Sequence, residues 1–129
     1  MQSSDASTRL CGIARDAGSR GVLEHSTGRW GVLILVALVP GAARFTELKR
    51  KVPGISDRML SQELQRLEQH GVVSRTAQDR KNSRVDYALT PPGSAIADQL
   101  VNLIAAIEEQ MPAILEAQRR YEQEGDSTL

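Results

Sequence analysis

Few residues in this chain have the types and the spacing that catalytic or metal-binding chemistry requires. The sequence holds one cysteine and two histidines (Cys11, His25 and His70), which are too few and too far apart for a standard zinc site. It contains no nucleophile with a recognisable base and no glycine-rich loop that would cradle a phosphate. His70 closes a helical pattern, where interaction with the helix dipole is its simplest role. We therefore expect neither an enzyme nor a bound metal or cofactor.

Polar residues suited to a different chemistry lie between Ser56 and Gly71. Ser56 is a good helix N-cap, and Gly71 is a good residue for the position after a helix end. Leu60, Leu64 and Leu67 form one apolar stripe between them. Because a helix turns by roughly 100° per residue, the opposite face is polar, with side chains that pair with base edges in a DNA major groove. The residues expected to contact DNA are Ser56, Arg58, Ser61, Gln62, Gln65 and Arg66. A solvated surface is the alternative interpretation.

A second polar cluster follows this helix. Residues 72–77 and 84–89 alternate as two strands, and residues 78–83 form a hairpin tip with adjacent bases between them. A tip of this kind reaches phosphates or the adjacent minor groove. The residues expected at this contact are Arg80, Lys81, Asn82 and Arg84. The candidate phosphate contacts on the short amphipathic helix before residue 52 are Arg44, Thr46 and Lys49.

The charge distribution separates these clusters from the rest of the chain, although the net charge is zero. Residues 44–84 hold ten basic and five acidic side chains, whereas residues 85–129 hold two basic and eight acidic ones. A basic middle with an acidic C-terminal part indicates a polyanionic partner for the middle only. Together with the two polar clusters, it favours double-stranded DNA as that partner. Solvated helix faces of differing sign would give the same charge pattern.

The elements that position these residues follow from hydrophobic periodicity and turn signals. Residues 9–26 form a weakly periodic helical segment, and residues 30–39 are apolar on nearly every side, as a buried helix or strand, with their leucines favouring helix. Thr90 and the prolines after it begin a long helix, which Pro112 should kink or break and which ends near Glu122. This order of elements predicts a mainly α fold with a small β-hairpin, a winged helix-turn-helix.

One domain accounts for the length of 129 residues. We expect a disordered tail at residues 1–8, a single winged-helix DNA-binding domain with its dimerisation helices at residues 9–122, and a loose tail at residues 123–129. The longest apolar run, residues 30–43, falls short of the about 20 residues that cross a bilayer, and no signal peptide is visible. These features predict a cytoplasmic protein without a membrane partner.

The sequence resembles the HxlR-type transcriptional regulators, a branch of the winged-helix proteins related to the MarR type. The resemblance covers roughly residues 22–107. It is carried by residues 28–30 (Gly-Arg-Trp), 44–50, 52–56 (Val-Pro-Gly-Ile-Ser), 58–62, Leu64, Leu67, Glu68, Gly71, 84–90 and Gly93. The resemblance implies a homodimer that binds a near-palindromic operator. We expect a repressor, although the sequence does not distinguish repression from activation. It places Arg58, Ser61, Gln62 and Arg66 on the recognition helix and residues 80–84 in the wing.

The chain departs from this family at particular positions. Many members carry a cysteine-proline pair about thirteen residues before the tryptophan, where this chain has Ala17. Cys11 lies nineteen residues before Trp30 and is a candidate redox sensor without that motif. The wing has Asn82 and Ser83 where the family commonly has two prolines. The C-terminal helix continues into an acidic extension.

An apolar stripe on the C-terminal helix continues past the length that a small winged domain needs for its own core. We expect this stripe and the N-terminal helices to hold a homodimer together. Its residues are Leu100, Leu103, Ile107 and Met111. A small-molecule effector is a further candidate partner, whose chemistry the sequence does not name. The alternative function is a winged-helix protein–protein interaction module without DNA binding, which would favour an apolar or acidic recognition face.

Overall fold

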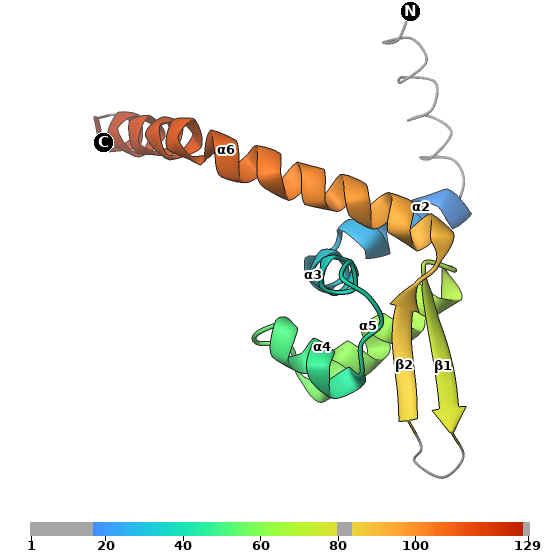
Figure 1. Ribbon diagram of the computed structural model, residues 1–129. Coiled ribbons are helices and arrows are strands. Elements are labelled where there is room, and N and C mark those ends of the chain that lie inside the picture. The colour runs from blue at the N-terminus through green and yellow to red at the C-terminus, as the bar shows by residue number, and fades with distance from the viewer. Residues whose placement is uncertain (1–16, 80–83, 128–129) are drawn as a thin grey trace, which may run out of the picture.

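The computed structural model describes residues 17–79 and 84–127, and within them the chain is mainly helical with one hairpin (Figure 1). The elements in chain order are α2 (Ala17–Thr27), α3 (Arg29–Ala37), α4 (Phe45–Lys51), α5 (Asp57–Gln69), β1 (Val73–Asp79), β2 (Arg84–Leu89) and α6 (Pro91–Ser127). Figure 1 shows α6 crossing one end of the molecule and the hairpin pointing away from it, with α4 and α5 beside the hairpin. The predicted mainly α architecture with a small hairpin is confirmed. In the two described ranges, no helix is long and apolar enough to span a membrane.

The core forms where the apolar sides of α3, α4, α5 and the start of α6 meet. Residues 30–39, whose pattern fits either a helix or a strand, lie mostly in helix α3, where Ile34 and Leu35 are fully buried. Because α3 is apolar on nearly every side, it packs against α2, α4, α5 and α6 together. Trp30 is half-buried against this core, and the Arg29 guanidinium carbon lies 4.5 Å from its ring centre.

Helix α5 begins and ends where the sequence indicates. Ser56 Oγ accepts a hydrogen bond from the Met59 backbone N–H at 3.1 Å. Gly71, just after the helix, has a φ of +79°, a left-handed conformation that glycine adopts at little cost. The three leucines of the predicted apolar stripe are at most 1% exposed. The N-cap, the helix end and the buried face are therefore all as predicted.

The hairpin is tied to the segment that precedes α4. Its first strand, expected over residues 72–77, extends to Asp79, which still pairs with Arg84. Ala43 and Tyr87 exchange two backbone hydrogen bonds of 2.9 and 2.8 Å, a bridge that the sequence pattern does not reveal. This bridge fixes the position of the hairpin relative to α4, and therefore relative to α5, the helix that follows α4.

Helix α6 is longer and more continuous than its sequence suggests. Thr90 caps it as predicted, because its Oγ1 accepts a hydrogen bond from the Gly93 backbone N–H at 3.1 Å. Pro112, expected to kink or break the helix, does not break it, and residues 123–127 are helical rather than loose. Proline removes one backbone donor, and the residues around it are exposed, so water can bond the Glu108 carbonyl that loses its partner.

The first part of the C-terminal apolar stripe belongs to the core. Leu100 is 5% exposed and Ala97 is fully buried, because this part of α6 packs on α3. Leu103 and Ile107 further along are 52% and 46% exposed. Leu100 is therefore a core residue, and the exposed part of the stripe begins at Leu103.

A close contact between α2 and α3 gives a stability prediction. A Cβ atom added at Gly31 would overlap the His25 backbone oxygen, whereas one added at Gly125, exposed on α6, meets nothing within 4 Å. We expect Gly31→Ala to lower the free energy of unfolding by about 1–3 kcal/mol, because α2 must shift. The matched control Gly125→Ala should leave it unchanged or raise it by up to about 1 kcal/mol. Urea denaturation measures both, and equal unfolding midpoints would contradict the contact.

Candidate nucleic-acid interface

Helices α4 and α5, joined by a short turn, form the helix-turn-helix that the sequence predicts. Their facing sides are buried, with Leu48 of α4 and Leu60 of α5 at 0% exposure. This packing holds α5 with its opposite side outward, where Arg58 and Gln65 are exposed and Gln62 is half-buried. A helix that is packed on one side and polar on the other suits a DNA major groove, which admits one α-helix.

The turn between the two helices uses two of the side chains that the sequence assigns to DNA. Ser56 Oγ accepts the capping hydrogen bond of α5, so its hydroxyl hydrogen is the part left to donate. Lys49 Nζ donates to the Ile55 backbone oxygen and lies 3.4 Å from an Asp57 carboxylate oxygen. Lys49 therefore braces α4 against the start of α5, and a phosphate would have to compete with these two partners.

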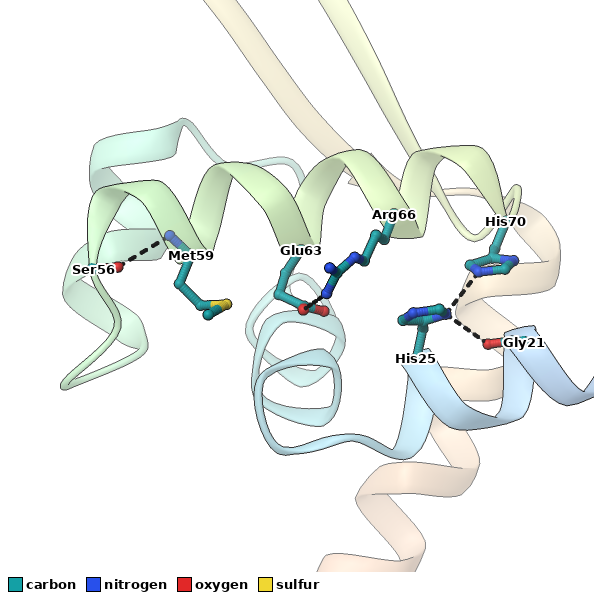
Figure 2. Close-up of polar contacts among 7 residues, drawn as sticks. All are labelled: Gly21, His25, Ser56, Met59, Glu63, Arg66 and His70. Atoms are coloured by element: carbon teal, nitrogen blue, oxygen red, sulfur yellow. Dashed lines mark hydrogen bonds and ion pairs between the residues drawn. The ribbon is translucent and has the colours of Figure 1, made fainter.

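Arg66 lies on the side of α5 that faces the other helices. Its guanidinium is 2.8 Å from the Glu63 carboxylate, and the Glu63 side chain is only 10% exposed. Figure 2 shows Met59, Glu63, Arg66 and His70 along this same side. Because a buried carboxylate needs a compensating partner, the first role of Arg66 is to neutralise Glu63.

A polar groove of about 340 Å³ lies between α5 and the hairpin. Its lining residues are Ser61, Gln65, Glu68, Arg75 and Tyr87. Ser61 and Gln65 were assigned to DNA from the sequence, but Arg75, an exposed residue of β1, was not. The signals for Arg75 were its basic charge within residues 44–84 and its place on the first strand of the hairpin. The groove extends the polar surface of the recognition helix onto the wing.

The wing and the start of α4 supply the remaining basic groups. Arg84, with a side chain 46% exposed, has its Nε 3.4 Å from an Asp86 carboxylate oxygen near the hairpin tip. Arg44 and Thr46 are exposed at the start of α4, beside the bridge that joins this segment to the hairpin. The other predicted wing contacts, Arg80, Lys81 and Asn82, and the candidate redox sensor Cys11 lie outside the described residues.

Known proteins resemble this chain in both sequence and fold. A family model described as HxlR-like helix-turn-helix matches residues 26–115. The HTH-type transcriptional regulator YtfH of Escherichia coli strain K12 is 46% identical over 103 residues, which cover 80% of this chain and 82% of that protein. The solved structure of the transcriptional regulator ytfH from Salmonella typhimurium has 48% identity and a TM-score of 0.71, over 79% of this chain and 90% of that one. The solved structure of diamide-treated YodB from Bacillus subtilis has 29% identity and a TM-score of 0.63, over 73% of this chain and 93% of that one.

The fold, the polar face of α5 and these matches together define a class of protein, the helix-turn-helix regulators that bind DNA to control transcription. Within that class, the chain belongs to the HxlR-like helix-turn-helix family. The resemblance noted in the sequence is thereby confirmed.

Proposed function

We propose that this regulator binds a near-palindromic operator as a homodimer and represses transcription by occupying it. The observation that carries the proposal is the outward face of α5, where Arg58, Gln62 and Gln65 stand on a helix whose other side is packed into the core. Arginine pairs bidentately with guanine and glutamine with adenine in the major groove. A protein–protein module would favour an apolar or acidic face at this place, so the polar, basic face supports DNA.

Basic residues around α5 supply affinity that does not depend on base sequence in this proposal. Arg75 and Arg84 flank the recognition helix on the hairpin, and Arg44 flanks it at the start of α4. We assign Arg80 and Lys81 of the wing to the same role. Contacts of this kind neutralise phosphates, release bound counterions and make affinity depend steeply on salt.

Helix α6 forms the dimer contact in this proposal, together with α2. Its 37 residues span roughly 55 Å, and Figure 1 shows its second half extending beyond the other helices. An apolar strip, defined here as Leu103, Ile107, Met111 and Leu115, follows one side of it. Three of these residues are 46–52% exposed, a surface typical of a subunit interface. A groove of about 410 Å³ lies between α2 and Ile96, near the start of α6. Because α2 is also assigned to the dimer contact, a small-molecule effector bound in this groove would act on that contact.

A selection experiment tests the proposal. The full chain is incubated with a library of random-sequence duplexes, and retained DNA is sequenced after several rounds. We expect enrichment of an inverted repeat whose half-sites lie about one helical turn, or a multiple of it, apart. With about six phosphate contacts, affinity for the enriched duplex should fall about 10³-fold between 50 and 200 mM salt.

A scrambled duplex of the same composition is the control, and it should bind more weakly at every salt concentration. A reporter gene placed behind the enriched site should lose expression when the protein is present. Operator binding would be contradicted if no sequence were enriched, or if the binding of the duplex did not depend on salt concentration. If reporter expression increased instead, only the proposed repression would be contradicted, and operator binding would stand.

A further inference from the structure

The groove between α2 and the start of α6, which Figure 1 shows close together, has the size of a small-molecule site. Its volume of about 410 Å³ falls within the roughly 300–1,000 Å³ of such sites. Its lining residues are Ser19, Val22, Leu23, Ser26, Thr27 and Ile96. Val22 and Ile96 are half-buried and pack against the core, so the core holds both walls of the groove in place.

One polar group in this lining lacks a partner. Ser26 is 3% exposed, and its Oγ atom is buried without a hydrogen bond to any part of the chain that the structure describes. The neighbouring Thr27 differs, because its Oγ1 donates to the Leu23 backbone oxygen at 2.6 Å. A buried hydroxyl without a partner destabilises a fold, and a ligand that bonds it removes that cost. The Ser26 hydroxyl is therefore the group through which the groove would orient a ligand.

The lining also determines the chemical class of the ligand. None of the described residues that line the groove carries a charge, so an ionised ligand would lose hydration without gaining a counter-charge. The aliphatic side chains of Val22, Leu23 and Ile96 suit an apolar body. A carbonyl oxygen accepts the Ser26 hydrogen without bringing a donor of its own, which these aliphatic side chains could not satisfy. The lining thus fits a neutral, largely apolar carbonyl compound.

A helix from a second copy of the chain is the other occupant to consider. The α2 wall runs from Ser19 to Thr27, a length of about 12 Å along the helix. A helix segment of that length, about 10 Å wide with its side chains, would fill roughly 900 Å³. The groove has less than half of that volume, and apolar side chains from a partner would leave the Ser26 hydroxyl unbonded. A small molecule therefore fits the groove better than a partner helix.

We propose that this groove binds a neutral, largely apolar carbonyl compound, whose oxygen accepts a hydrogen bond from the Ser26 hydroxyl. The hydroxyl turns about a single bond, χ1, to meet the ligand oxygen. The proposal rests on the effector groove of the proposed function and names the class of ligand that it takes. Binding itself involves only α2 and α6, so it can be measured on the free protein.

Three compounds of similar size test the proposal by NMR titration of the full, isotopically labelled chain without DNA. Acetophenone carries the carbonyl oxygen, ethylbenzene lacks it, and benzoate carries a negative charge. We expect acetophenone to shift the backbone amide signals of α2 and of Ile96. It should bind about two- to tenfold more tightly than ethylbenzene, the ratio that one net hydrogen bond produces. Benzoate should leave these signals unchanged.

A substitution at Ser26 identifies the group that makes the hydrogen bond. Ser26→Ala should bind acetophenone no more tightly than ethylbenzene, while its affinity for ethylbenzene stays at the wild-type value. Because the substitution removes a buried hydroxyl without a partner, the variant should fold with unchanged or higher thermal stability. Ser94→Ala is the matched control, because Ser94 is exposed at the start of α6 and does not line the groove. It should keep the wild-type preference for acetophenone.

The outcomes separate this proposal from operator binding. If acetophenone leaves the α2 signals unchanged, as it would if a second copy filled the groove, the ligand site is wrong and operator binding stands. If acetophenone and ethylbenzene bind equally, or Ser26→Ala keeps the preference for acetophenone, the role of the hydroxyl is wrong. If acetophenone binds as expected but no duplex is enriched in the selection experiment, operator binding fails and the ligand site stands.

Discussion

Replacing Gln62 with alanine should weaken operator binding by about 1–3 kcal/mol and relax the base preference at one or two positions. Arg58 lies about one helical turn before Gln62 on α5, and Arg58→Ala should have an effect of the same size. Both side chains stand on the outward face of α5 in its N-terminal half. Among the described residues neither has a hydrogen bond or an ion pair, so their polar groups are available to base edges. Binding of each variant to operator and scrambled duplexes across a salt series measures the effect.

Gln69→Ala is the matched control, because it removes the same kind of side chain from an exposed position at the far end of the helix. Its operator affinity should stay close to that of the wild type.

In the same series, removal of both Arg80 and Lys81 should weaken operator and scrambled DNA about equally and reduce the log–log salt slope by about two. If Gln62→Ala weakens all sequences alike, or the wing variant keeps its salt slope, the division between base recognition and charge neutralisation is wrong.

The recognition helix could be predicted from the sequence because its signals are local. A Ser56 side chain caps a backbone N–H three residues later, and Gly71 ends the helix through its own backbone conformation. The buried leucines repeat at helical spacing, so the outward face follows by geometry alone. The cap of α6 at Thr90 is local in the same sense.

Contacts between distant segments could not be predicted in this way. The bridge between Ala43 and Tyr87 and the hydrogen bond between His25 and His70 each join segments more than forty residues apart. The orientation of Arg66 depends on the burial of Glu63 against neighbouring helices, which periodicity does not reveal. Each of these contacts becomes visible only when the helices are packed together.

The continuation of α6 through its proline and the burial of Leu100 show a related limit. Helix propensity gives Pro112 a cost of about 3 kcal/mol, but the surrounding turns of the helix outweigh one lost hydrogen bond. Leu100 and Leu103 carry the same side chain on the same helix, and only the position of α3 decides which one is buried. The strip beyond Leu100 is therefore the part of α6 for which the described chain supplies no cover, and it is the part where a partner subunit would pack.

Leu103→Glu combined with Ile107→Glu should convert the dimer to a monomer and reduce operator affinity at least about 100-fold. The two carboxylates would be buried without partners in the interface, and separate monomers lose the linkage between half-sites. Both side chains are about half exposed in the single chain, so helix content should not change. Asn102→Glu, exposed on another side of α6, adds the same charge away from the strip and should remain a dimer. Light scattering at micromolar concentration and operator titration measure both outcomes; a double variant that stays dimeric and binds the operator normally would place the interface elsewhere.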